Sequence, residues 1–155
     1  MRLAIVVARW NSSMTLKLRD GALGALQEKG CVGSDVSVFE VPGAFELPLA
    51  CLTAAKSGTY DAVIALGVVI RGDTPHFDFV AGQCARGIMK AGLETGIPVL
   101  FGVITADTEQ QALDRCGEKA DNKGYEAAVS AVEMVDTMRR IRFAGRGEKA
   151  LPHVV

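Results

Sequence analysis

The sequence has few of the side chains that bind metals or form disulfide frameworks. Its 155 residues include two histidines and four widely spaced cysteines, with no CxxC or HxxxH pair. A structural zinc site needs clustered ligands, and a disulfide scaffold needs a higher density of cysteine. The spacing therefore argues against both and predicts no metal. It favours reduced, semi-buried thiols in a cytoplasmic protein.

Nucleotide-binding and membrane-spanning motifs are also missing. There is no GxGxxG or GxxxxGK[ST] stretch, so neither dinucleotide nor P-loop binding is supported. No apolar run reaches the length of a membrane helix, and no signal-peptide pattern is present. A net charge of −1 provides no basic excess to meet a phosphate backbone. We therefore expect neither nucleic acid nor a membrane as a partner.

The sequence does contain a regular alternation of strand-length apolar runs and helical stripes. The expected strands are residues 3–8, 36–41, 62–70 and 99–104. The expected helices are residues 14–29, a segment after Glu46 that ends near Ser57, a segment from Asp78 to Gly96, a short one from Asp107 to Arg115, and a final one after Gly124. Strands that are apolar on both faces and alternate with helices predict a parallel sheet covered on both sides. The predicted domain is residues 1–142, followed by a tail at 143–155 that includes His153 and receives no role.

The run at residues 62–70 is the longest expected strand, and a tight polar turn follows it. This turn, residues 71–75, brings the only internal histidine, His76, to the start of a helix. Ligands of open α/β sheets bind beyond the carboxyl ends of the strands, and histidine titrates near neutral pH. His76 is therefore a candidate proton-transfer residue. The alternative is that it only caps the helix or fills space.

The turns after the other strands carry further candidates. Trp10 and Asn11 follow the first strand, and Phe45 and Glu46 follow the second. An indole could stack on a planar heterocycle, although an isolated tryptophan is also common in a core. Glu46 could accept hydrogen bonds from ligand hydroxyls, or could simply complement a helix dipole.

A group of basic residues precedes the final helix. Arg115, Lys119 and Lys123 lie within nine positions of one another. Basic side chains beside a helix N-terminus can form an anion site. Glu118 and Asp121 lie among them, so a solvated charge cluster remains an equal alternative.

Four blocks of the sequence resemble one family: VPGAFELP, GVVIRGDTPHFDFV, FGVITADT, and the Asn122-Lys123-Gly124 segment with EAAVSAVEM after it. Together they are similar to 6,7-dimethyl-8-ribityllumazine synthases, from about Leu3 to Ile141. The resemblance implies a flavodoxin-like α/β/α sandwich of three layers with a central four-stranded, mainly parallel sheet. It implies condensation of 5-amino-6-ribitylaminouracil with 3,4-dihydroxy-2-butanone 4-phosphate in riboflavin biosynthesis. No metal and no organic cofactor are implied.

The resemblance also implies roles for individual residues, with His76 in proton transfer. Trp10 would stack on the pyrimidine, Glu46 would bond the ribityl chain, and Arg115 would bind the phosphate. The substrate-binding residues implied are Trp10, Asn11, Ala44, Phe45, Glu46, Val69, Ile70, Asp73, Thr74, Phe101, Arg115 and Lys123. Phe101 would close the pocket from a neighbouring subunit, because members of this family form pentamers, some of which close into icosahedral shells.

Three positions depart from the family's commonest pattern. Trp10 stands where phenylalanine is usual, which favours tighter binding of flavin-like products. Asp73 puts a carboxylate beside the proposed phosphate site, and Arg71 could offset it. Asp121 stands where glycine is common, at a position expected to be left-handed. Two alternatives to the synthase therefore remain: a riboflavin-binding or shell-forming homologue with weak catalysis, and a monomeric flavodoxin-like phosphate-binding module.

Overall fold

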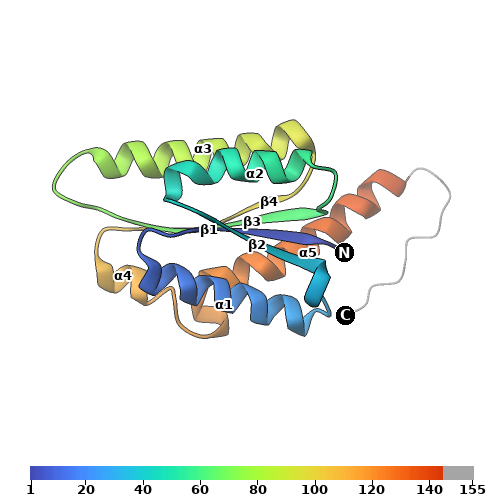
Figure 1. The fold of residues 1–155 in the computed structure, drawn as a ribbon, viewed down its shortest axis with the longest axis horizontal. Helices are drawn as coiled ribbons and strands as arrows, with labels where there is room; N and C mark the ends of the chain where they lie inside the picture. The colour runs from blue at the N-terminus through green and yellow to red at the C-terminus, as the bar shows by residue number, and fades with distance from the viewer. Residues whose placement is uncertain (145–155) are drawn as a thin grey trace.

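A four-stranded sheet lies between two layers of helices in the computed structural model, which describes residues 1–144 (Figure 1). The spatial order of the strands is β2-β1-β3-β4, and every neighbouring pair is parallel. The strands are β1 (Leu3–Ala8), β2 (Val36–Val41), β3 (Ala62–Ile70) and β4 (Val99–Ala106). The predicted three-layer α/β/α sandwich is confirmed, with a sheet that is wholly rather than mainly parallel.

Helices α2 and α3 cover one face of the sheet, and α1, α4 and α5 cover the other (Figure 1). The α-helices are α1 (Ser12–Glu28), α2 (Leu47–Lys56), α3 (His76–Thr95), α4 (Glu109–Leu113) and α5 (Lys123–Phe143). Three short 3₁₀ turns lie between them: η1 (Gly33–Asp35), η2 (Ala44–Glu46) and η3 (Lys119–Asp121). Among residues 1–144, no helix is both long enough and apolar enough to span a bilayer.

Some element boundaries differ from the prediction. Strand β4 continues to Ala106, which pairs with Ile70, because the ladder with β3 extends beyond the apolar run. Helix α3 begins at His76 rather than Asp78, since Pro75 with φ −64° already has a helical backbone. Thr108 rather than Asp107 caps the short α4, and its side chain accepts from the Gln111 backbone N–H. Helix α5 includes Phe143, the first residue of the predicted tail, and residues 145–155, including His153, lie outside the described part.

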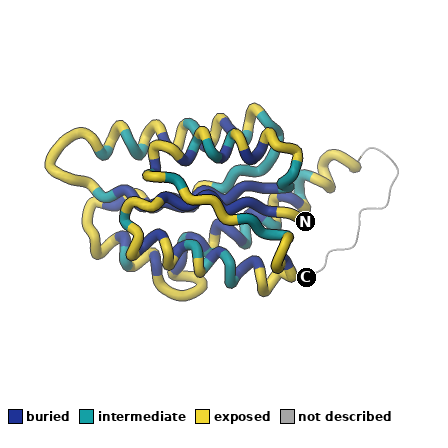
Figure 2. Tube along the Cα trace, viewed as in Figure 1, coloured by how far each residue is buried: buried dark blue, intermediate teal, exposed yellow. Residues whose placement is uncertain are grey.

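The two central strands form the core of the domain. All of β1 and all of β3 up to Val69 are buried (dark blue in Figure 2). Side chains such as Ile5 and Leu66 pack toward α1 and α5, while Val6 and Val63 pack toward α2 and α3. Strand β2 does not fit the expectation that every strand is apolar and buried on both faces. It is an edge strand, and its central residues are exposed.

Helices α1 and α5 cross at very close range. A Cβ on Gly124 would overlap the Leu18 carbonyl oxygen and lie 2.6 Å from the carbonyl carbon. The neighbouring Asn122 is 3% exposed and caps α5, accepting from the Tyr125 N–H at 3.0 Å. Its amide also donates to the Lys17 and Gly117 carbonyls at 3.1 and 2.9 Å. Asn122 and Gly124 therefore fix the start of α5 against α1.

The four cysteines are free and buried. Burial raises the pKa of Cys51 to about 12 and that of Cys84 to about 11. Burial also raises the pKa values of Cys31 and Cys116. Such thiols are scarcely ionised at neutral pH and behave as small apolar side chains. The sequence predicted semi-buried thiols, whereas all four are buried.

Candidate functional site

The turns that follow the strands gather at one end of the sheet (Figure 1). In parallel sheets this carboxyl end is the usual place for a ligand. The chain here brings together the β1–α1 turn, the β2–α2 turn with η2, and the long β3–α3 loop. Two groups of predicted site residues result, one at the ends of β1–β3 and one beside β4.

Hydrogen bonds hold the β1–α1 turn against the β2–α2 turn and the end of β3. The Trp10 backbone N–H donates to the Pro42 carbonyl at 3.0 Å, and the Asn11 amide donates to the Val68 carbonyl at 2.9 Å. Asn11 has a left-handed backbone with φ 63°, which asparagine tolerates well. This conformation allows α1 to start directly after the turn, with Asn11 held against the end of β3.

Two aromatic rings and a carboxylate lie on the surface at this end. Trp10 is 75% exposed and Phe45 is 60% exposed. A Cβ on Gly43 would lie 3.2 Å from the Glu46 Oε2 atom and 4.0 Å from the Trp10 Cβ, so both residues border Gly43. Ala44, between Gly43 and Phe45 in the chain, is buried. The structure excludes the core alternative for Trp10, whose ring is open to a ligand.

The strand register exposes backbone groups next to Trp10 and Asn11. Pairing between β1 and β3 stops at Val7 and Leu66, whereas β3 pairs with β4 as far as Ile70. Residues 67–70 therefore extend beyond the end of the β1–β3 pairing. On the side of β3 that faces β1, the Val68 carbonyl accepts a hydrogen bond from the Asn11 amide. Backbone groups of successive residues face opposite sides of a strand, and the Arg71 N–H bonds the Ala106 carbonyl of β4. The Val69 N–H and carbonyl therefore also face β4, whereas those of Ile70 face the side of the Val68 carbonyl and can meet a planar hydrogen-bonding ligand.

The loop from Arg71 to His76 is exposed throughout. The Thr74 Oγ1 atom accepts from the His76 backbone N–H at 3.4 Å, and His76 opens α3 with its ring on the surface. His76 does not fill a core position. Arg71, which could offset the charge of Asp73, forms its ion pairs with Asp107 and Asp78.

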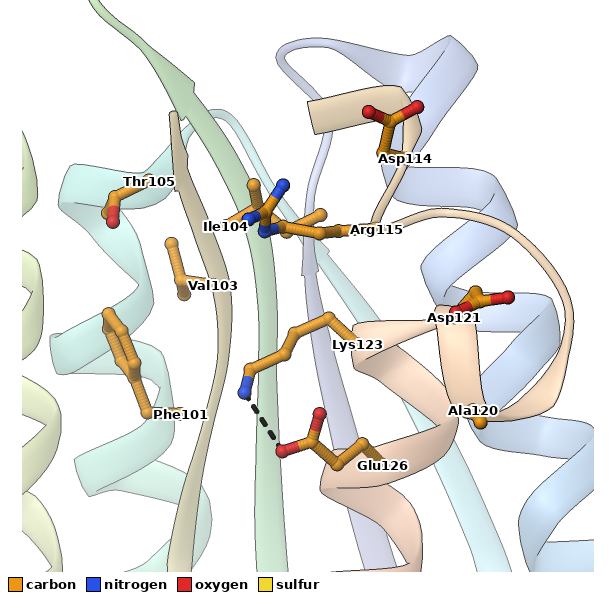
Figure 3. Close-up of a pocket in the computed structure, with 10 residues that line it drawn as sticks. All are labelled: Phe101, Val103, Ile104, Thr105, Asp114, Arg115, Ala120, Asp121, Lys123 and Glu126. Carbon is orange, nitrogen blue, oxygen red and sulfur yellow. Dashed lines mark hydrogen bonds and ion pairs between the residues drawn. The ribbon is translucent and has the colours of Figure 1, made fainter. Parts of the chain in front are cut away.

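A pocket of about 580 Å³ lies along the outer edge of β4 (Figure 3). Three of the predicted site residues line it, namely Phe101, Arg115 and Lys123. The full lining is Phe101, Val103, Ile104, Thr105, Asp114, Arg115, Ala120, Asp121, Lys123 and Glu126. All of these residues come from β4 and the chain that follows it. The pocket therefore shares no lining residue with the group at the ends of β1–β3.

The charges in the pocket are mixed. Lys123 reaches toward β4, and its Nζ atom pairs with Glu126 Oε1 at 3.0 Å (Figure 3). The Arg115 Nη1 atom donates to the Gln111 carbonyl at 2.8 Å, and the Arg115 carbonyl accepts from the Lys123 N–H at 2.9 Å. Three carboxylates also line the pocket, but the Gln111 contact occupies one of the five Arg115 N–H donors and the Glu126 contact one of the three on Lys123, so both cations keep donors for an anion. Glu126 was not predicted, although it lies one helical turn after Lys123.

The third cation of the predicted basic group faces elsewhere. Lys119 Nζ pairs with Glu28 Oε1 at 3.2 Å, and Glu28 also accepts from the Tyr125 hydroxyl at 2.7 Å. Lys119 has the left-handed backbone, with φ 44°, that was predicted for Asp121. The 3₁₀ turn η3 places the left-handed residue at its start, so Asp121 needs no special conformation.

No group of three or more His, Cys, Asp or Glu side chains in residues 1–144 could hold a metal ion. The candidate site therefore consists of aromatic rings, backbone amides, cations and one imidazole. These groups suit an organic, phosphorylated ligand and proton transfer.

Comparison with known proteins gives a match to one family model and, among many relatives, to the protein described next. The sequence model of the family described as 6,7-dimethyl-8-ribityllumazine synthase matches residues 1–139. A protein of Syntrophus aciditrophicus (strain SB) named 6,7-dimethyl-8-ribityllumazine synthase is 51% identical over 141 residues. That alignment covers 91% of this chain and 92% of the relative.

Proposed function

Because this chain belongs to the 6,7-dimethyl-8-ribityllumazine synthase family, we propose how its own residues carry out that synthesis. The protein is a transferase of riboflavin biosynthesis. Its substrates are 5-amino-6-(D-ribitylamino)uracil and 3,4-dihydroxy-2-butanone 4-phosphate, and its products are 6,7-dimethyl-8-ribityllumazine, phosphate and water. The two groups of site residues bind these two substrates.

The group at the ends of β1–β3 binds the pyrimidine. Trp10 and Phe45 stack on the ring, and the Ile70 backbone groups bond its polar edge. Glu46 accepts hydrogen bonds from the ribityl hydroxyls. The observation that best supports this assignment is the exposure of Trp10 beside an overhanging segment of β3. Asn11 and Ala44 shape this part of the site.

The pocket beside β4 binds the phosphate. Arg115 offers a planar guanidinium that matches two phosphate oxygens, and Lys123 adds a second positive charge. A dianionic phosphate competes with Glu126 for Lys123, and it binds the Arg115 donors that the Gln111 carbonyl does not occupy. Holding the leaving group's charge lowers the barrier to its elimination. The turn with Asp73 and Thr74 supports the same end of the substrate.

His76 moves the protons. Schiff-base formation, phosphate elimination and ring closure each transfer protons near neutral pH, which suits an imidazole. Its exposed ring at the start of α3 can approach a ligand bound against Trp10. The remaining acceleration comes from holding two reactive molecules side by side. We place this reaction in the cytoplasm.

Replacing His76 by asparagine tests this assignment. Asparagine keeps the size and polarity but cannot titrate, so we expect kcat to fall by about 10- to 100-fold with little change in KM. Lumazine formation is followed by absorbance, with a protein-free reaction as the control because the substrates also condense unaided. If wild type and variant both match that control while riboflavin still quenches Trp10 fluorescence, the chain is a binding homologue.

We also propose that a second copy of the chain completes each site. An apolar groove of about 480 Å³ runs beside β4 between α3 and α5, and its lining includes the exposed residues Met89, Leu93 and Met134. Phe101 lines both this groove and the phosphate pocket. A copy covering the groove would therefore also reach Phe101. We propose a homopentamer, able to close into an icosahedral shell.

Sedimentation velocity of the full chain tests the assembly. We expect a species of at least five copies, and we expect Leu93→Asp to dissociate it, because Leu93 is 77% exposed in one chain. The matched control is Arg139→Ala on α5, which does not line the groove and pairs with Asp61 just before β3. A wild-type monomer would contradict the proposal and favour the flavodoxin-like module.

A further inference from the structure

We propose that Arg71 is a positioning residue, which holds the His76 loop and the Arg115 segment in a fixed relation to each other. Arg71 itself does not contact either residue and lies where β3 ends. The inference rests on the roles proposed above for His76 and Arg115. It adds a residue that neither the reaction nor substrate binding has used so far.

The Arg71 side chain joins the end of β3 to two other segments: the residue that follows β4 and the first turn of α3. The Arg71 Nε atom donates to Asp107 Oδ1 at 2.9 Å, immediately after β4. Its Nη1 atom donates to Asp78 Oδ1 at 3.2 Å, in the first turn of α3. Its Cζ atom lies 4.3 Å from the ring centre of Phe77, the residue after His76. The Arg71 backbone N–H also donates to the Ala106 carbonyl at 2.8 Å.

A second set of hydrogen bonds continues from Asp107 to Arg115. The Asp107 backbone N–H donates to Gln111 Oε1 at 2.8 Å. The carbonyl of the same glutamine accepts from Arg115 Nη1 at 2.8 Å. Helix α4 has only five residues, too few to be stable without tertiary contacts. The placement of Arg115 therefore depends on how Asp107 and Gln111 are held.

Apart from Arg71, the His76 loop is anchored at Phe77, which packs against the core between the sheet and helices α2 and α3. Residues 71–76 are exposed, and the Thr74–His76 hydrogen bond lies within the loop itself. The contacts of Arg71 with Phe77 and Asp78 are the ones that reach across to its far end. Exposed ion pairs contribute little to global stability, whereas the buried β3–β4 ladder does not depend on them. Loss of Arg71 should therefore loosen the loop without unfolding the domain.

Arg71 acts through geometry and not by proton transfer. Its hydrogen bond to Asp107 raises the pKa of the guanidinium above its already high usual value. The group stays charged, with its donors divided between two carboxylates. Lysine would place one positive charge near both carboxylates. It lacks the planar guanidinium, whose separate N–H groups bind the two carboxylates and whose flat face covers Phe77.

The test compares steady-state kinetics of wild type, Arg71→Ala, Arg71→Lys and Arg139→Ala. We expect Arg71→Ala to lower kcat/KM by about 10- to 100-fold, through both a lower kcat and a higher KM for the phosphorylated substrate. Arg71→Lys should recover part of the loss. Arg139→Ala breaks a comparable cross-element pair, to Asp61 at 3.3 Å near the amino end of β3, and should retain wild-type kinetics.

A double variant isolates the positioning effect. In an Arg115→Ala background, Arg71→Ala should no longer raise the KM for the phosphorylated substrate, because the residue to be positioned is gone, but should still lower kcat through His76. Thermal melting should change little for any Arg71 variant. Wild-type kinetics in Arg71→Ala, or an equal KM increase in both backgrounds, would overturn the role of Arg71. An inactive wild-type chain would instead contradict the proposed function.

Discussion

Replacing Arg115 by alanine is expected to lower kcat/KM for lumazine formation by about 1,000-fold. The phosphate leaves as an anion, and removing a guanidinium that stabilises developing charge costs about this much in comparable sites. Arg115 lines the pocket beside β4, and its Nη1 atom is held by the Gln111 carbonyl rather than by a carboxylate. The loss should affect both kcat and the KM of the phosphorylated substrate.

The matched control for this experiment is Lys119→Ala. Lys119 lies only four positions further along the chain but pairs with Glu28 outside the pocket, so the variant should keep wild-type kinetics. Inorganic phosphate provides a second measurement without turnover: it should inhibit the wild type competitively and inhibit Arg115→Ala far more weakly. Equal losses in the two variants would mean that general charge, and not the pocket, controls the rate.

Replacing Gly124 is expected to have the largest effect on folding. A methyl group there would enter the backbone of Leu18 on α1, which cannot rotate away as a side chain could. We expect Gly124→Ala to lower the free energy of unfolding by about 3 kcal/mol, at the upper end for overpacking. Gly124→Val should yield chain that is insoluble or unfolded. Urea denaturation followed by circular dichroism measures the change.

Gly24 provides the matched control, since it also lies within a helix of the same pair. Nothing lies within 4 Å of a Cβ placed on Gly24. Gly24→Ala should therefore stabilise the protein by up to about 1 kcal/mol, because alanine favours helices over glycine. Opposite signs for the two substitutions would identify the close helix crossing as the cause. Similar small gains at both positions would contradict it.

The sequence was sufficient to predict most of the fold because the strands are short apolar runs bounded by polar turns. The bounds of β1, β2 and β3 agree with the prediction. Thr105 and Ala106 were missed because the continuous apolar run stops at Ile104, whereas pairing with β3 continues. Burial of β2 was overestimated because apolar composition does not reveal which strand lies at an edge.

The candidate site was less predictable than the fold. Its loops could be identified, since polar turns after parallel strands meet at one end of the sheet. The partners of each side chain could not, because they depend on tertiary placement. Arg71 was considered only as a charge that could offset Asp73, and its hydrogen bond to Asp107, 36 positions away, was not predicted. Lys119 was grouped with Arg115 by sequence spacing, but the backbone of η3 directs it toward Glu28.

The crossing of α1 and α5 also bears on how the chain folds during synthesis. Leu18 leaves the ribosome about 100 residues before Gly124, whose missing Cβ makes room for the Leu18 backbone. Until then, the apolar stripe of α1 can cover one part of the growing sheet but lacks its neighbouring helix. Contacts so distant in sequence form late and slowly. The nascent domain should therefore remain open on this face, and accessible to chaperones, until α5 has been made.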